Sequence, residues 1–408
     1  MDDPLVDLSK AVPDGTAVDA TRPEQAFQMG QVMTIVGGHF MHDTYSAFIA
    51  PLLPLLQERL ATGYALTGGL AVYAQLPSLL NPFIGYLADK VSLRYFIILA
   101  PAVTATLLSS MGRASNYLAL AMLLLAAGVS IAAFHAPAPA MVGRISGSRV
   151  GRGMSLFMAG GELGRTLGPI FAVAGVGWFG LEGTWRLAVV GWLVSVILYF
   201  RLRHVPARPP EKKQFAAAEF WPKARRVFPA LGWLLLGRVF LLSSLTTYLP
   251  LFMDDVLHAS LWLAAASLSI LEAAGVVGAL FTGTLSDRLG RSRVLFILFA
   301  VSPLLLVGFL YGPGWLTVPM LIGLGLTVIS PQPVMLAVVQ DQFPESRALA
   351  NGTYLALGFL IRAVGIWSVG AAADRFGLQT AYLWSGAGAL LTLPAILMLP
   401  KAPQTPPG

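Results

Sequence analysis

Several ionisable side chains of this 408-residue chain stand inside long apolar segments, where a charge needs a chemical explanation. On insertion scales a charge at the centre of a membrane helix costs about 2.5–3.5 kcal/mol. Three arginines are of this kind, Arg165, Arg238 and Arg362. A guanidinium keeps its proton and binds carboxylate, phosphate or phosphonate through paired hydrogen bonds. The arginines therefore predict a site for an anionic substrate, with internal pairing or an interfacial position as the alternative for each.

Two acidic residues accompany these arginines. Glu162 precedes Arg165 by three positions, so the two share a helix face and are expected to pair. The protonation of Glu162 would then depend on whether the arginine is free or occupied by substrate, and we expect this to couple proton release to anion binding. A fixed salt bridge is the alternative. Glu272 is a lone acid in its apolar segment, and it is either a second proton site or a partner of Arg238.

A cluster of His39, His42 and Asp43 has the spacing i, i+3, i+4, which places all three near one helix face. Imidazole titrates near neutrality, and a neighbouring carboxylate raises its affinity for a proton, so the cluster predicts a proton relay. Two imidazoles and a carboxylate also suit zinc or iron, and His135 would then be a possible further ligand. The third alternative is polar packing between helices.

Three further residues are candidates for hydrogen bonds to a substrate: Gln332, Tyr45 and His135. Gln332 lies between Pro331 and Pro333, where a broken helix would expose backbone carbonyls to a cavity. No catalytic residue is predicted, because the chain has no ordered serine–histidine–aspartate set and lacks the additional histidine-rich motifs of a di-iron membrane enzyme. We also predict no cofactor.

The composition decides which class of element must position these residues. Hydrophobic residues make up 56% of the chain, charged residues only 12%, and the mean hydropathy is +0.71. Soluble domains carry about 25% charged residues, so this chain cannot cover itself with a polar surface. We expect an all-α membrane protein with twelve transmembrane helices in two pseudo-symmetric six-helix bundles. The expected spans are roughly 30–57, 64–88, 94–111, 117–142, 152–178, 184–203, 225–253, 260–285, 292–312, 314–340, 347–373 and 378–399.

The distribution of lysine and arginine predicts the orientation. The net charge is +7, but the bases lie in breaks between apolar runs, which indicates membrane topology rather than nucleic-acid binding. Only Arg59, Arg113, Arg186 and Arg375 fall in breaks on the non-cytoplasmic side, so both termini are expected in the cytoplasm. The absence of cysteine excludes disulfides and thiolate metal sites. The expected regions are a tail 1–28, a bundle 29–203, a basic linker 204–224, a bundle 225–399 and a tail 400–408.

A repeated motif supports the two halves. The stretch from Gly85 to Arg94 returns from Gly283 to Arg293, 198 residues later, and each copy places an acid and several bases after an apolar run. The acid can cap a neighbouring helix and pair with the bases, which predicts a cytoplasmic gate, and the glycine permits close helix approach. The gate candidates are Gly85, Asp89, Lys90, Arg94, Gly283, Asp287, Arg288 and Arg291. Pro137–Pro139 and Pro331–Pro333, and Arg165 and Arg362, repeat at nearly the same offset.

These motifs resemble the major facilitator superfamily over essentially the whole chain. The second copy matches its loop signature almost completely, whereas the first has Ser92 and Leu93 where glycine and arginine are usual. The run 39–56, with its histidines and prolines, is similar to the first span of the fosmidomycin-resistance group of drug exporters, and the glycines around Arg165 are similar to an antiporter signature.

The resemblance implies a monomeric, multi-pass protein of a bacterial inner membrane that exports a small anionic or amphiphilic compound in exchange for protons by alternating access. Two alternatives use the same residues: a proton-coupled importer of an anionic metabolite, and a metal or metal-chelate exporter using His39, His42 and Asp43. An intramembrane enzyme or a non-transporting receptor is a more distant alternative, and the latter would need a sizeable extramembrane domain.

Overall fold

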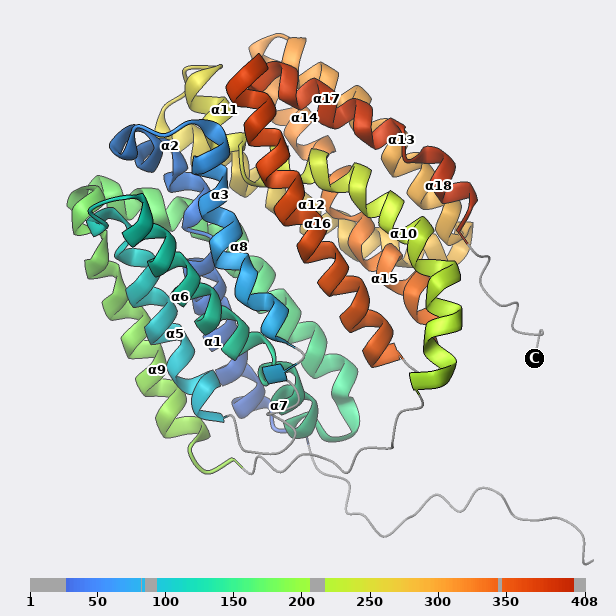
Figure 1. Cartoon of the computed structure of the whole chain (residues 1–408). Helices are drawn as coiled ribbons and strands as arrows, with labels where there is room; N and C mark the ends of the chain where they lie inside the picture. Colours follow the sequence, from blue (N-terminus) through green and yellow to red (C-terminus); the bar gives the residue numbers. More distant parts are fainter. Residues whose placement is uncertain (1–26, 82, 85–93, 206–216, 344–346, 400–408) are drawn as a thin grey trace, which may run out of the picture.

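The computed structural model describes residues 27–81, 83–84, 94–205, 217–343 and 347–399, and within these ranges every regular element is helical. The predicted linker and tails, and the gate residues Gly85, Asp89 and Lys90, lie wholly or mostly outside the described residues. Figure 1 shows the helices arranged as two groups, with the first half of the chain on the left and the second half on the right.

The first half contains eight labelled helices. They are α1 (Met29–Ser46), α2 (Ile49–Leu60), α3 (Tyr64–Gln75), α5 (Arg94–Ser109), α6 (Tyr117–His135), α7 (Ala138–Ile145), α8 (Val150–Gly183) and α9 (Ala188–Leu202). The second half is built in the same order. It contains α10 (Ala217–Thr246), α11 (Leu249–Asp255), α12 (Leu261–Leu289), α13 (Arg291–Tyr311), α14 (Thr317–Leu324), a π-helical turn (Gly325–Ile329), α15 (Pro331–Gln342), α16 (Arg347–Phe376), α17 (Leu378–Leu390) and α18 (Leu393–Leu397).

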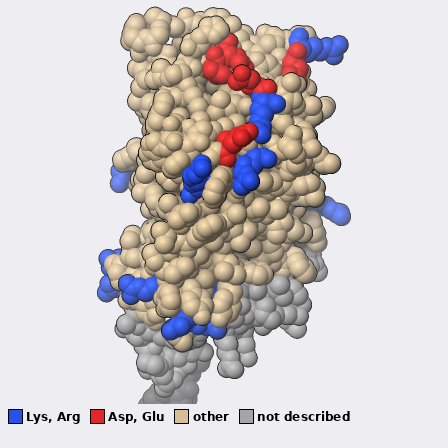
Figure 2. Space-filling model, turned by 90° about the vertical axis from the view of Figure 1, so that its left-hand side faces the viewer, with Lys and Arg blue, Asp and Glu red and all other residues tan. Residues whose placement is uncertain are grey.

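Each of the twelve expected spans contains helix, so the model is consistent with the predicted architecture. Among the described residues, eight helical segments are long and apolar enough to cross a membrane, and one of them, Gly151–Leu202, covers two expected spans. Large apolar side chains such as Phe200, Leu280 and Leu304 are exposed on the outer surface. On the face drawn in Figure 2, acidic side chains occur only away from the grey atoms, while the end next to them shows only Lys and Arg. The chain is a multi-pass membrane protein.

Helix breaks occur at corresponding places in the two halves. The first span of each half is broken, between α1 and α2 and between α10 and α11. The fourth span is also broken in each half, at Pro137 between α6 and α7 and at Pro331 after the π-helical turn. Proline has no N–H to continue the helical ladder, which explains the second pair of breaks.

The two halves share a core at one end only. One cluster of buried side chains runs across both halves through α2 and α11, and it includes Phe48, Leu52 and Phe252. Towards the other end each half has a separate core, around Phe134 and Phe157 in the first half and around Phe220 and Phe343 in the second. The halves are therefore packed together at the α2/α11 end.

Hydrogen bonds between the halves reinforce this closed end. The carboxylate of Asp374 on α16 accepts from the backbone N–H groups of Tyr64 and Ala65, at 2.5 and 3.0 Å, and so caps the first turn of α3. The hydroxyl of Tyr64 donates to Asp255 at 2.9 Å. A Cβ on Gly68 would overlap the hydroxyl of Tyr248, which explains why glycine stands at this contact.

Candidate functional site

Glycines on α8 allow α1 to approach it closely. A Cβ at Gly164 would overlap the carbonyl oxygen of Phe40, and one at Gly168 would overlap Ala47. A Cβ at Gly161 would overlap the ring of His39. Small residues at such positions let membrane helices pack at backbone contact distance. The α8 glycines therefore create the room in which the polar face of α1 is buried.

That face carries Asp43 at the centre of a polar cluster. Its carboxylate lies 3.3 Å from Nε2 of His39, 3.3 Å from Nε2 of His135 and 3.1 Å from Nδ1 of His42. His39, His42 and Asp43 are almost fully buried, whereas the side chain of His135 is 34% exposed. The prediction that the three α1 residues share one face is confirmed, and the fold adds His135 from the end of α6.

The outer nitrogens of this cluster have defined partners. Nδ1 of His39 donates to the carbonyl of Phe157 at 2.8 Å, and Nδ1 of His135 donates to the carbonyl of Ile131 at 3.0 Å. These roles are assigned from the partners, because a carbonyl oxygen can only accept. The ring of His39 also stacks on that of Phe157, with centroids 3.9 Å apart. Both imidazoles are thus held with Nε2 directed at Asp43.

The other ring nitrogen of His42, Nε2, points away from Asp43. This nitrogen lies 3.2 Å from the hydroxyl of Thr104, which in turn lies 2.8 Å from the hydroxyl of Ser130. Ser130 can donate to the carbonyl of Ala100 at 3.4 Å. Each hydroxyl can donate or accept, so the chain can reverse its direction when His42 gains a proton. Thr104 and Ser130 were not predicted, since hydroxyl residues are common in membrane helices and carry no sequence signal of their own.

A second group of charges joins the two halves. Arg165 and Glu162 form the ion pair expected from their spacing on α8, which confirms that prediction. Glu272 on α12 interacts electrostatically with Arg165 and with Arg362 on α16. The Arg165 side chain is 44% exposed although it interacts with Glu162 of its own helix, Glu272 of α12 and Asp43 of α1, so we infer that its exposure is towards the interior. We call Glu162, Arg165, Glu272 and Arg362 the central charge layer.

Arg362 is incompletely bonded within this layer. One terminal nitrogen donates to the hydroxyl of Thr246 at 3.1 Å, and its buried Nε has no hydrogen-bond partner. Buried polar groups are normally satisfied, so an exception indicates a place where a ligand or water completes the site. Thr246 was not predicted, because only the folded contact distinguishes it from other threonines.

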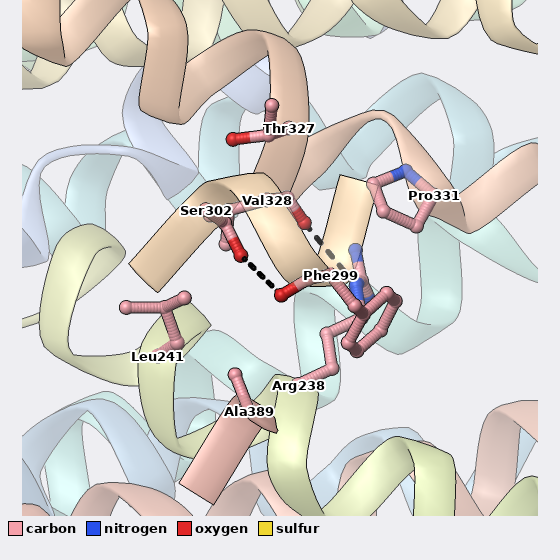
Figure 3. Close-up of a pocket in the computed structure, with 8 residues that line it drawn as sticks. All are labelled: Arg238, Leu241, Phe299, Ser302, Thr327, Val328, Pro331 and Ala389. Atoms are coloured by element: carbon pink, nitrogen blue, oxygen red, sulfur yellow. Dashed lines mark hydrogen bonds between the residues drawn. The ribbon is translucent and has the colours of Figure 1, made fainter. Parts of the chain in front are cut away.

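Arg238 is bonded in a different way. Its guanidinium donates to the carbonyls of Val328 and Ile329, at 3.2 and 3.3 Å, and to the side-chain oxygen of Gln332 at 2.8 Å. Pro333 has no N–H, so it cannot donate to Ile329 as in an α-helix or to Val328 as in a π-helix. Figure 3 shows Arg238 beside Val328, next to a pocket of only about 10 Å³.

This arrangement bears on three expectations from the sequence. The free carbonyls of Val328 and Ile329, at the broken fourth span of the second half, do not face a cavity, because each accepts a hydrogen bond from Arg238. Arg238 and Gln332 were predicted to bind substrate, but each is engaged within the protein, and a pocket of about 10 Å³ holds no more than a water molecule. The alternative partner for Glu272 was Arg238, whereas the structure places Glu272 near Arg165 and Arg362.

Tyr45 was likewise predicted to contact substrate, and in this conformation it is engaged within the protein. Its side chain is fully buried, and its hydroxyl donates to the carbonyl of Leu187 at 2.5 Å. A larger open pocket of about 550 Å³ lies between α3, α6 and α16 and is lined by uncharged residues including Tyr73, Tyr117 and Trp367. None of the ionisable candidates lines this pocket.

Three of the described gate residues, Arg94, Asp287 and Arg291, are bonded within their own halves. Arg291 donates to Asp287 at 2.5 Å and to Asp341 at 3.3 Å, and these residues all belong to the second half. Arg288 is exposed. Arg94 donates to the carbonyl of Val205 at 3.2 Å. A Cβ on Gly283 would meet no atom of the described residues within 4 Å, so the expected close approach of a neighbouring helix is not seen within the described part of the chain.

A bundle with buried charges between two like halves is the architecture of a membrane transporter rather than of an enzyme. Residues 35–366 match the family model described as Major Facilitator Superfamily. The chain belongs to this superfamily.

Relatives of known sequence cover most of the chain. The chain is 23% identical over 381 residues to the fosmidomycin resistance protein of Escherichia coli, covering 90% of this chain and 92% of that protein. It is 24% identical over 363 residues to an uncharacterised MFS-type transporter of Bacillus subtilis, covering 85% and 87%.

Solved structures support the fold. A bacterial homologue of the human lysosomal transporter Spinster, in an inward-facing and unoccupied conformation, matches with a TM-score of 0.79 at 15% identity over 94% of this chain and all of that one. A D-xylose–proton symporter matches with a TM-score of 0.73 at 14% identity over 92% of this chain and 99% of that one. Such low identity shows the shared architecture and leaves the substrate open.

Proposed function

We propose that this chain is a proton-coupled transporter of small anionic or amphiphilic compounds, and that the substrate anion binds in the central charge layer. The observation that carries the proposal is that Glu272 interacts electrostatically with both Arg165 and Arg362, which belong to opposite halves. A ligand bound there would touch both halves at once, as alternating access requires. The buried Nε of Arg362 has no hydrogen-bond partner among the described residues, so the protein leaves this guanidinium incompletely satisfied.

The charge balance of the layer predicts how protons take part. Two arginines and two glutamates compensate each other, and an entering anion competes with the glutamates for the guanidinium groups. Two like charges about 4 Å apart repel by about 4 kcal/mol at an effective dielectric constant of 20. A glutamate displaced by the anion therefore gains affinity for a proton, so that anion and proton bind together.

The sequence led us to expect that anion binding releases a proton, whereas this charge balance predicts that anion binding promotes proton uptake. Uptake of both together favours the importer over the exporter. Cooperative binding of an anion and a proton produces symport, in which both move in one direction. A second candidate function is proton-driven export, which is favoured by similarity to the fosmidomycin resistance protein. His39, His42 and Asp43 stay a predicted proton relay, and the proposal does not depend on them.

The orientation is part of the proposal. Lys and Arg dominate the end of Figure 2 next to the grey atoms, which supports a cytoplasmic location for that end and for both termini. The closed α2/α11 end would then face the outside, and the cavity would open to the cytoplasm. We propose a bacterial inner membrane as the location and a monomer as the working unit.

Reconstituted liposomes with an internal pH-sensitive dye test the proposal. With no gradient imposed, small phosphonates and carboxylates are added outside, with lipophilic cations as the comparison. Symport predicts that anions acidify the interior, whereas antiport predicts that they make it alkaline. We expect the signal to fall at least about tenfold in Arg165→Met and Arg362→Met, because each loses a charged anion partner worth about 1.5–3 kcal/mol.

The control is Arg113→Met, which removes an arginine stacked on Trp185 outside the layer and should leave the signal unchanged. Thermal unfolding in detergent shows whether each variant is folded. Unchanged anion-driven proton flux in the folded Arg165→Met/Arg362→Met double variant would refute the anion site.

A further inference from the structure

The cluster of His39, Asp43 and His135 brings together electron-pair donors without a hydrogen between them. Each imidazole uses its Nδ1–H on a backbone carbonyl, so in the neutral form Nε2 carries a lone pair. Both Nε2 atoms face the carboxylate of Asp43, which is itself an acceptor. Acceptors in contact repel unless a cation lies between them.

The distances in this cluster match those of a metal ligand set. The two Nε2 atoms are 3.4 Å apart, and each lies 3.3 Å from an oxygen of Asp43. A tetrahedral zinc site with bonds of about 2.0–2.1 Å has ligand atoms about 3.3–3.4 Å apart. His39 faces one carboxylate oxygen of Asp43 and His135 faces the other. One ligand atom from each of the three residues lies within 4.8 Å of the other two, so a small rotation of the carboxylate would bring them to three corners of such a site.

The surroundings have the outer shell that such ligands need. A metal-binding histidine usually donates its other N–H to a carbonyl or carboxylate, and a ligating carboxylate usually accepts a further hydrogen bond. His39 and His135 donate to Phe157 and Ile131, and His42 lies 3.1 Å from Asp43. His42 is thus an outer partner rather than the ligand suggested by its spacing in the sequence.

Access and room are also present. His135 is 34% exposed, so the fourth corner faces the interior space. Gly161 leaves the volume that a side chain would otherwise take beside His39 and Asp43. Arg165 interacts electrostatically with His135 and Asp43, but its charge is compensated by the ion pair with Glu162.

We propose that His39, Asp43 and His135 bind one divalent transition-metal ion of the zinc class, which would join α1 to α6 and keep one coordination position open to the cavity. This inference goes beyond the proposed function. It concerns an ion on the wall of the first half, whereas the substrate site lies between the halves.

Purified full-length protein in detergent, stripped with a chelator, provides the test. Equilibrium dialysis with Zn²⁺ should show one ion per chain, and Co²⁺ should give the intense visible absorption of a four-coordinate site. His135→Ala changes a half-exposed side chain and is the variant least disturbing to the fold. We expect it, and His39→Ala, to weaken Zn²⁺ binding at least about tenfold, since loss of even an outer partner costs 10–100-fold.

The other two histidines supply the matched control. His204 and His258 are exposed and lie outside the cluster, and His258 has φ +51°, which asparagine tolerates. The double variant His204→Ala/His258→Asn should bind Zn²⁺ as the unmodified chain does. Absence of stoichiometric binding, or binding unaffected by His39→Ala and His135→Ala, overturns the proposal and leaves a proton as the cation of this cluster. Neither result bears on the anion site, because the measurement needs no transport.

Discussion

The first and fourth spans meet in both halves of the molecule, and the two meeting points have opposite chemistry. In the second half, Arg238 of α10 supplies a permanent cation, and the carbonyls and amide oxygen around α15 surround it. In the first half, α1 and α6 supply the acceptors Asp43, His39 and His135, and no lysine or arginine donates to them in the described contacts.

The two halves share the same order of helices, but they differ in the balance of charge at this level. A guanidinium cannot leave or lose its proton, so the second meeting point is a fixed part of the fold. The first meeting point needs an exchangeable cation, either a proton or a metal ion, and can therefore change state. We infer that the second half is rigid at this level, and that the first half changes state when its proton or metal ion binds or leaves.

Removal of the permanent cation should have the largest effect. Arg238→Met would leave two carbonyls and the oxygen of Gln332 buried without their donor. Each such loss costs about 1–3 kcal/mol, so we expect the variant to lose about 3 kcal/mol of folding free energy or more. Thermal or denaturant unfolding in detergent measures this loss. Arg165→Met is the matched comparison and should lose little, because Arg165 is exposed and only Glu162 pairs with it by hydrogen bonding.

An intermediate effect is expected where α8 makes room for the first cluster. In Gly161→Ala the new methyl group would overlap the ring of His39, and overpacking of this kind costs about 1–3 kcal/mol. Gly283→Ala is the control, because its methyl group would meet no atom of the described residues within 4 Å. If both variants unfolded at the temperature of the unmodified protein, the close packing of α1 on α8 would be contradicted.

The smallest effect concerns the hydroxyl chain behind His42. Thr104→Val keeps the shape but removes the hydroxyl that lies 3.2 Å from His42 and 2.8 Å from Ser130, at a cost of about 1 kcal/mol. Tyr354→Phe is the counterpart in the second half, where the hydroxyl is 3.5 Å from Gln332, and it should cost less. Equal losses of folding free energy in the two variants would mean that the first meeting point depends no more on its hydroxyl than the second does.

Local sequence patterns were sufficient to predict the class of fold and several local contacts of this protein. The apolar runs and the repeated motif predicted a membrane protein of two like halves, because burial of an uncharged helix in lipid depends only on consecutive residues. The helical period predicted the shared face of His39 and Asp43 and the pairing of Glu162 with Arg165. Pro331 and Pro333 predicted the broken fourth span in the same way.

Only the tertiary structure decided which polar groups meet across helices. Arg238 looks like Arg165 and Arg362 in the sequence, yet the carbonyls released by Pro333 satisfy it, while Arg362 keeps an unpartnered nitrogen. His135 lies beside Asp43, Tyr45 is buried in the core, and Glu272 interacts electrostatically with arginines of opposite halves. The physical reason is that the energy of a charge in a low-dielectric interior depends on the partners around it, and these partners come from segments far apart in the chain.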